Sequence, residues 1–213
     1  MEEFSVYVID FEGSLQTGIL EYGMVEVSST NGILGADTQL CRNKTNISHL
    51  EQECHHLQND TLSHCSYFEA YVEQFIKARQ NAFFCAHNAA FENTLLSAYA
   101  PVLTTHNQSH TWEPWVDTYF LYKKYLKISS CGLKELIEMF DLRGVLEKIS
   151  GKFCPPTRKN FHCALYDALA CALLFLNFIR LPEIQSKSLT WLLQMSSPLK
   201  TVQELQQQQL FKA

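Results

Sequence analysis

The amino-acid sequence predicts a mixed α/β fold, in which one β-sheet is flanked by helices. The apolar run at 4–9, which ends at Asp10, is rich in β-branched and aromatic residues and indicates a buried strand. Two alternating segments, 20–27 and 33–41, indicate further strands, with Asn31-Gly32 between them as a two-residue hairpin turn. Because these strands precede a region in which strands alternate with helices, the order indicates a mixed sheet.

The remaining elements follow from apolar spacing along the chain. Residues 43–64 are polar, and we expect this segment to be irregular. Helical spacing recurs further on, with one strand-like run at 82–86; the helical segments are 67–76, 91–99, 117–126, 133–140 and 164–178. The last of these is apolar on almost every side, which predicts a helix inside the core. Residues 189–195 are expected to form one more helix that packs on the domain.

Composition limits the class of protein. The chain has 213 residues, of which 46% are hydrophobic and 18% charged, and this balance is typical of a globular domain with a short extension. No apolar run approaches the length of a membrane span, and the acidic start does not resemble a leader, so we expect a cytoplasmic protein. Eight cysteines occur singly, without a C-x-x-C pair, which favours reduced thiols over a disulfide framework.

Asp10 and Glu12 form a D-x-E motif where the first strand ends. Residues two apart on a strand project from the same face, so both carboxylates enter one small volume. Their repulsion is relieved when a cation lies between them, and carboxylate oxygens suit a divalent metal ion. The motif therefore predicts a metal site, although an exposed acidic strand end produces the same short pattern.

Three further segments carry groups that a two-metal phosphodiester hydrolase needs. The segment 86–92 follows an apolar run and contributes Glu92, while His162 and Asp167 flank the start of the long apolar helix. A weaker third segment contains Asp117. A helix N-terminus favours anions, which suits a cluster of carboxylates at the start of that helix.

In their order and spacing these motifs resemble those of the DEDDh 3′-to-5′ exonuclease family, whose members include the epsilon proofreading subunit of polymerase III and exonuclease X. The resemblance covers about residues 4–178, and the H-x-A-L-x-D-A element at 162–168 is its most specific part. It implies a ribonuclease-H-like fold with a mixed five-stranded sheet flanked by helices. It also implies an exonuclease domain at 1–181, followed at 182–213 by a helical extension with a Gln-rich tail.

The resemblance implies a role for each acidic residue of the motifs. Asp10, Glu12, Glu92 and Asp167 would bind two Mg²⁺ or Mn²⁺ ions, which as hard cations prefer oxygen ligands. His162 would act as the general base in the attack of a metal-activated water on the terminal phosphodiester. An imidazole titrates near neutral pH, which suits that task.

The resemblance also implies the residues that bind the terminal nucleotide: Gly13, Ser14, Leu15, His87, Asn88 and Phe91. Phe91 fits an ordinary core position equally well. The chain departs from the family at Glu92, where the family carries Asp, and at Gly13-Ser14, which replaces the usual threonine after D-x-E. Glu has one more methylene than Asp, so its carboxylate reaches a metal with altered geometry.

The implied substrate is the 3′ end of a nucleic acid, either single-stranded or frayed. DNA is the first choice, because residues 15–21 look closer to exonuclease X and epsilon than to oligoribonuclease, and trimming of RNA is the alternative. The net charge of -5 argues against a long electrostatic grip on a duplex. An alternative of another class is a weakly active or non-catalytic nucleic-acid-binding module associated with a polymerase.

Two smaller features suggest other ligands. Residue types that bind zinc gather in one short stretch: Cys54, His55, His56, His64 and Cys65. Their spacing fits no common closed zinc site. The tail residues Gln207, Leu210 and Phe211 resemble the Q-x-x-L-F peptides that dock on bacterial sliding clamps, whereas the alternative is an amphipathic last helix packed on its own domain.

Overall fold

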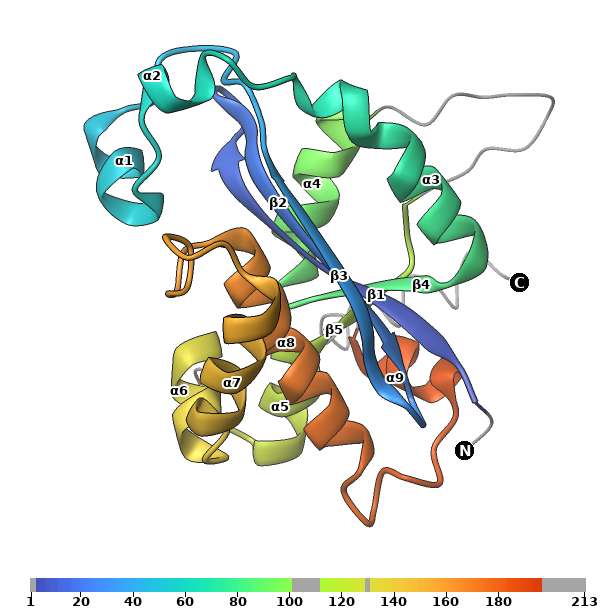
Figure 1. The fold of residues 1–213 in the computed structure, drawn as a ribbon. Coiled ribbons are helices and arrows are strands. Elements are labelled where there is room, and N and C mark those ends of the chain that lie inside the picture. The colour runs from blue at the N-terminus through green and yellow to red at the C-terminus, as the bar shows by residue number, and fades with distance from the viewer. Residues whose placement is uncertain (1–2, 101–111, 129–130, 197–213) are drawn as a thin grey trace, which may run out of the picture.

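The computed structural model describes residues 3–100, 112–128 and 131–196. Five strands form one sheet in the order β3-β2-β1-β4-β5 (Figure 1). Their bounds are β1 (Ser5–Ser14), β2 (Gly18–Ser28), β3 (Gly32–Leu40), β4 (Phe83–Ala86) and β5 (Trp115–Asp117). β1, β2 and β3 pair antiparallel, whereas β4 pairs parallel with β1 and with β5. The predicted mixed five-stranded sheet is therefore confirmed.

Helices cover both faces of this sheet (Figure 1). They are α1 (His49–His55), α2 (Asn59–Leu62), the 3-10 helix η1 (Phe68–Tyr71), α3 (Val72–Asn81), α4 (Ala89–Tyr99), α5 (Thr118–Leu126), α6 (Leu133–Met139), α7 (Arg143–Phe153), α8 (Ala164–Ile179) and α9 (Leu189–Ser196). On one face α8 packs on β1 and β2, with α5, α6 and α7 against it. On the other face lie η1, α3 and α4.

The side chains of β1 divide between two cores. Val6 and Val8 enter the core beneath α8, whereas Ile9 enters the aromatic core beneath η1, α3 and α4. Because alternate residues of a strand share a face, Asp10 and Glu12 continue the row of Val6 and Val8. The strand that builds the core therefore delivers both carboxylates to the face that α8 covers.

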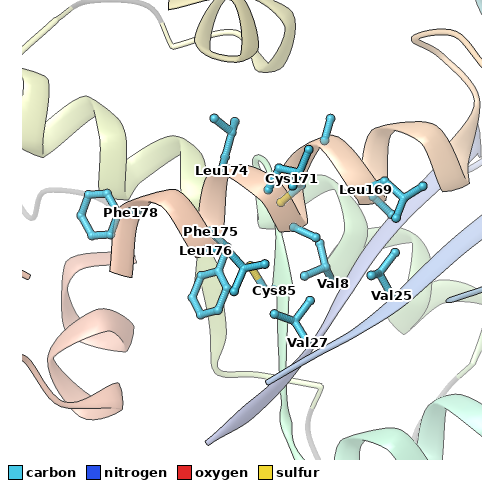
Figure 2. Close-up of a cluster of buried hydrophobic side chains, with 14 of the residues drawn as sticks. Val8, Val25, Val27, Cys85, Leu169, Cys171, Leu174, Phe175, Leu176 and Phe178 are labelled. Carbon is cyan, nitrogen blue, oxygen red and sulfur yellow. The ribbon is translucent and has the colours of Figure 1, made fainter. Parts of the chain in front are cut away.

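The helix α8 is the central element of the larger core (Figure 2). Nearly all of its residues are buried, and Val8, Val25 and Val27 of the sheet pack with its Phe175 in one cluster. Burial of each large apolar side chain contributes about 1.5–3 kcal/mol. The helix is thus anchored along its length, which fixes the position of its first turn.

Two helices lie in the segment 43–64, which we expected to be irregular, so that expectation is wrong. α1 begins with a capping box, in which Ser48 Oγ accepts the Glu51 N–H and the Glu51 carboxylate accepts the Ser48 N–H. The pattern S-x-x-E is the sequence signature of such a start. Helices as short as α1 and α2, with few apolar residues, leave almost no periodic signal.

Other differences from the predicted elements are local. The hairpin between β2 and β3 has three loop residues, 29–31, because Ser28 and Gly32 still pair as strand residues and Ser28 Oγ accepts the N–H groups of Thr30 and Asn31. The two-residue turn at Asn31-Gly32 is therefore wrong. The predicted helix at 67–76 begins as η1 before α3, and α7 was not predicted.

The last described helix, α9, packs against α5 and β5, as expected for 189–195. Its Ser196 Oγ accepts the Asp117 N–H at 2.8 Å. The division of the chain at residue 181 stays a prediction. Gln207, Leu210 and Phe211 lie outside the described residues. Within the described ranges, every helix is too short or too polar to cross a bilayer.

Candidate active site

The strand β1 ends in a sharp turn that presents Glu12. A bulge interrupts the pairing of β1 with β2 after Glu12, where Gly13 has φ +129°. A Cβ at position 13 would lie 2.1 Å from the Gly18 carbonyl oxygen, so the turn requires glycine. Glu12 is 9% exposed, and Asp10 is partly buried. Both carboxylates are thus held at the rim of the core.

Asp167 reaches this strand end from the first turn of α8, where it is 7% exposed. The helix approaches the sheet closely because Gly23, which pairs with Asp10, has no side chain. A Cβ at position 23 would lie 2.4 Å from the Ala164 carbonyl carbon. This contact between helix backbone and sheet backbone brings Asp167 to the carboxylates of β1.

His162 is held beside Asp167 by its own backbone. Its φ is +64°, and its N–H donates to Asp167 Oδ2 at 3.0 Å, while the imidazole is exposed. One ligand atom from each of Glu12, His162 and Asp167 lies within 4.8 Å of the others. In the described part of the chain, no other three His, Cys, Asp or Glu side chains come together in this way.

A buried ion pair fixes the loop that carries His162. Arg158 donates through Nη2 and Nε to the two carboxylate oxygens of Glu21, at 2.5 and 3.1 Å. Its Nη1 donates to the His55 carbonyl at the end of α1, at 2.6 Å. Glu21 Oε2 also accepts the N–H of Ala164, the first residue of α8, at 3.0 Å. One ion pair therefore ties β2, α1, the His162 loop and α8 together.

Glu92 enters from the first turn of α4 and is 4% exposed. Its carboxyl group faces the Phe11 backbone of β1, which acts to lower the carboxyl pKa against the larger effect of burial. The helix is positioned by Asp117, whose carboxylate oxygens accept the N–H groups of Asn88 at 3.1 Å and Ala89 at 2.9 Å. The end of β5 thus fixes the start of α4 and, with it, Glu92.

The carboxyl groups of the site raise one another's pKa. Burial, followed by the charges of Asp167 and Glu21, raises the pKa of Glu12 to about 8. Burial likewise raises the pKa of Asp167 to about 7. The pKa values of Asp10 and Glu92 lie well above the ordinary carboxyl value, first through burial and then through neighbouring carboxylates. Near neutral pH such a cluster takes up either protons or a cation.

Two oxygen atoms of the cluster lack a hydrogen-bond partner among the described residues: Glu92 Oε2 and Asp167 Oδ1, both buried. Buried polar atoms are normally paired, so these acceptors point to a missing cation. A set made of carboxylate oxygens is what hard divalent ions prefer. The residues present therefore fit a divalent metal ion.

A cavity of about 570 Å³ opens between the turn after β1, the start of α1 and one side of α4. Ser14, Leu15 and Phe91 contribute to its wall. Leu15 is 57% and Phe91 43% exposed, so Phe91 is a surface residue and the alternative of a core position is wrong. Ser14 closely follows Glu12 in the sequence and Phe91 directly precedes Glu92, so the same two segments carry the cavity wall and two carboxylates of the acidic cluster.

His87 is braced by the protein and does not line this cavity. Its Nδ1 lies 2.8 Å from Thr118 Oγ1 and its Nε2 lies 2.7 Å from the Cys131 carbonyl oxygen. Burial lowers the pKa of the imidazole to about 4, so the ring is neutral at pH 7. Because a carbonyl only accepts, Nε2 carries the proton. A role for His87 in substrate binding stays a prediction.

The zinc-type side chains at 54–65 do not gather into a site. Within the described residues, no three of them bring ligand atoms together. His55 Nδ1 instead accepts the Leu57 N–H at 3.2 Å, and the His55 carbonyl binds Arg158. The described residues therefore provide no support for a zinc site at 54–65.

Solved structures that resemble the chain are nucleases. Exonuclease X in complex with 5′-overhanging duplex DNA has a TM-score of 0.65 and 18% identity, and the match covers 90% of this chain and 99% of that one. The nuclease domain of 3′hExo, a DEDDh family member bound to rAMP, has a TM-score of 0.59 and 14% identity over 84% and 93% of the two chains. The chain shares its fold with these nuclease structures. The predicted ribonuclease-H-like architecture is thereby confirmed.

Two further comparisons agree with this shared nuclease fold. E. coli exonuclease I in complex with a dA16 oligonucleotide has a TM-score of 0.60 and 11% identity, over 85% of this chain and 42% of that one. The PolC-type DNA polymerase III of Thermotoga petrophila is 27% identical over 188 residues, which is 84% of this chain. The chain spans only 12% of the length of that polymerase. No sequence-family model matches the chain.

Three supporting residues of the site, Glu21, Gly23 and Arg158, were not found by sequence reasoning. Glu21 lies among apolar residues of a predicted strand, and a charge in that position signals a buried partner. No spacing rule identifies that partner as Arg158, which is 137 residues away. Gly23 carries no signal of its own, because a close helix approach is visible only in three dimensions.

Proposed function

We propose that the protein is a metal-dependent 3′-to-5′ exonuclease, which hydrolyses the terminal phosphodiester bond of a nucleic-acid strand and releases nucleoside monophosphates. The observation that carries this proposal is the convergence of Glu12, His162 and Asp167 into one group. Asp10 and Glu92 belong to the same cluster, because each charge acts on another's pKa. The fold shared with nuclease structures agrees with that chemistry.

We assign two Mg²⁺ or Mn²⁺ ions to the acidic cluster, with Asp10, Glu12, Glu92 and Asp167 as their ligands. The support is the all-oxygen donor set and the two buried oxygens that lack partners. When bound, such ions activate a water molecule and stabilise charge on the phosphate. The bound form of E. coli exonuclease I in one solved structure holds zinc, so the choice of metal for this chain is open to test.

We assign the general-base role to His162. Its imidazole is exposed to the solvent that supplies the attacking water, and it lies next to the carboxylates of Glu12 and Asp167. The backbone bond from His162 to Asp167 and the Arg158 ion pair limit the movement of its loop. A base held in this way accepts a proton without a reorganisation of the site.

We assign the terminal nucleotide to the cavity between the turn after β1 and α4. Leu15 and Phe91 offer apolar surface to the base, and the turn at Gly13 and Ser14 lies beside the sugar. The Ser14 hydroxyl holds this turn in shape, because its Oγ accepts the N–H groups of Gln16 and Thr17. Asn88 is exposed and directly precedes α4, the helix that carries Glu92.

We propose a DNA 3′ end as the first substrate, with RNA as the alternative. Exonuclease X and E. coli exonuclease I were solved with DNA, whereas 3′hExo was solved with rAMP, and a related 3′-exonuclease recognises a histone mRNA stem-loop. The preference for DNA rests on the sequence at 15–21. No observation favours the alternative of a non-catalytic module, because all five groups of the cluster are present.

The test is an assay of purified protein with 5′-labelled single-stranded DNA and RNA in Mg²⁺, Mn²⁺ or EDTA. We expect stepwise shortening from the 3′ end in the presence of metal, and none in EDTA. The variants Asp10→Ala and His162→Ala should abolish this shortening. The control Asp60→Ala, which changes an exposed residue of α2, should not. No shortening of either strand with any metal would overturn the proposal in favour of a binding module.

We also propose that the protein works in the cytoplasm. All eight cysteines are free thiols in the structure, and most of them are buried. Free thiols of this kind persist in a reducing compartment.

A further inference from the structure

A basic and aromatic surface lies beyond the end of β3, formed by Arg42, Lys44, Tyr67 and Tyr99; we call it the Tyr67 surface. The Arg42 guanidinium carbon lies 5.4 Å and Lys44 Nζ lies 4.6 Å from the centre of the Tyr67 ring. Lys44 Nζ also lies 5.7 Å from the centre of the Tyr99 ring. Among the described aromatic rings, Tyr67 alone is contacted by two cations.

The charge of the Tyr67 surface is only partly balanced by acidic groups. Lys44 forms an ion pair with Glu69. No carboxylate of the described residues pairs with Arg42, which is exposed. Tyr67 is 42% exposed. In a chain of net charge -5, this surface therefore keeps one free positive charge beside an accessible ring.

The Tyr67 surface is joined directly to the turn at 15–18, which carries residues of the nucleotide cavity. The Lys44 N–H donates to the Thr17 carbonyl oxygen at 2.7 Å. The Tyr99 hydroxyl donates to the Leu15 carbonyl oxygen at 2.6 Å. The surface and the cavity thus share one wall, since Leu15 and Gln16 line the cavity.

We propose that the Tyr67 surface binds a segment of single-stranded nucleic acid outside the catalytic pocket. A guanidinium pairs with phosphate, and an exposed tyrosine stacks on a base of any sequence. A strand whose end occupies the cavity can continue over the shared wall onto the surface, as the contacts of Lys44 and Tyr99 connect the two. This inference rests on the proposed function, because it names how the substrate is gripped away from the reacting bond.

The test compares two surface variants with a matched control. Arg42→Gln/Lys44→Gln removes two charges, and Tyr67→Ala removes the ring. The control Lys77→Gln/Lys187→Gln removes one ion-paired lysine and one lysine that lies over an aromatic ring, Trp191, on other parts of the protein. For each protein, we would measure the affinity for a fluorescent oligothymidylate of about 15 nucleotides in EDTA. The rates of cleavage of that strand and of a thymidine dinucleotide are then measured in Mn²⁺.

We expect both surface variants to bind the long strand at least about fivefold more weakly than the wild type. For Tyr67→Ala this corresponds to the loss of one stacked base, and for the double variant to the loss of a phosphate contact. The double variant should also lower the slope of log K against log salt by about one. Cleavage of the dinucleotide should stay within about twofold of the wild type, because the catalytic pocket is intact. The control should bind like the wild type.

Unchanged binding of the long strand by both surface variants would overturn the inference, as would an equal loss in the control. These outcomes leave the proposed exonuclease activity standing, because cleavage is measured separately. Conversely, an absence of cleavage in every protein leaves the binding measurement in EDTA to decide the inference alone.

Discussion

At the residue scale, the stability of the folded protein depends on whether protons or a metal ion neutralise the acidic cluster. The pKa values of Glu12 and Asp167 are raised to about 8 and about 7 from ordinary values of 4.5 and 3.8. At a pH between the ordinary and the raised pKa of either group, the folded state binds more protons than the unfolded state. The contribution of these two carboxyl groups to the stability of the metal-free protein is therefore fully present at low pH and is lost as pH rises through their folded pKa values.

We expect the melting temperature in EDTA to fall between about pH 5 and pH 8 by this linkage. Mn²⁺ should raise the melting temperature strongly near pH 8, where it replaces protons, and only weakly near pH 5. Thermal unfolding followed by circular dichroism, with and without metal, measures both effects. A metal-free melting temperature that rises across this pH range would contradict the raised pKa values.

The single residue Glu92 supports a second prediction, because it departs from the Asp of the family and is buried in the cluster. Glu92→Gln keeps the shape of the side chain and removes its charge. Near pH 8 in EDTA, the variant should melt at a higher temperature than the wild type. Its exonuclease rate in Mn²⁺ should fall by at least about a hundredfold, and Mn²⁺ should stabilise it less.

The control for Glu92 is Glu53→Gln, which removes an exposed carboxylate of α1 and should behave like the wild type. Full Mn²⁺ stabilisation of Glu92→Gln would show that this carboxylate is not a ligand.

At the scale of secondary-structure elements, the Glu21–Arg158 ion pair connects the pieces that the site requires. Breaking such a buried pair from one side leaves an uncompensated charge and costs about 3–5 kcal/mol. Arg158→Met should therefore lower the free energy of unfolding by that amount in urea denaturation. The double variant Glu21→Gln/Arg158→Met should lose less than the sum of the two single variants.

The pair of Arg143 and Glu138 provides the comparison, because its side chains are 37% and 52% exposed, against 11% and 2% for Arg158 and Glu21. Arg143→Met should cost below about 1 kcal/mol. Equal losses for Arg158→Met and Arg143→Met would mean that the buried pair does not hold the His162 loop.

Elements with a long apolar pattern could be predicted from the sequence, and elements fixed by polar groups could not. The strands β1 to β4 and the helix α8 lie where alternation and apolar runs indicate them. The helix α1 is defined by its capping box, whereas α2 has no side-chain cap and is held by Asn59 Oδ1, which accepts the Ile47 N–H and an Asn43 side-chain N–H. The bounds of the β2–β3 loop depend on the Ser28 hydroxyl, which has no periodic signature.

At the scale of the whole molecule, the convergence of Glu12, His162 and Asp167 could be predicted, but the residues that support them could not. Short local motifs predict the candidate site residues. D-x-E at a strand end indicates Asp10 and Glu12, and H-x-A-L-x-D-A at a helix start indicates His162 and Asp167. The residues that bring these motifs together act across the fold. Asp117 holds the start of α4 through backbone N–H groups, and it was recognised in sequence only as a weak third segment.

The central claim is that carboxylates from β1, α4 and α8 form one metal site. The most direct measurement is a titration of Mn²⁺ into the metal-free protein, with free Mn²⁺ followed by electron paramagnetic resonance. We expect Asp167→Asn to lower the affinity for Mn²⁺ by at least about tenfold, and Asp60→Asn, at an exposed position of α2, to leave it unchanged. Equal Mn²⁺ affinity in the wild type and Asp167→Asn would contradict the claim.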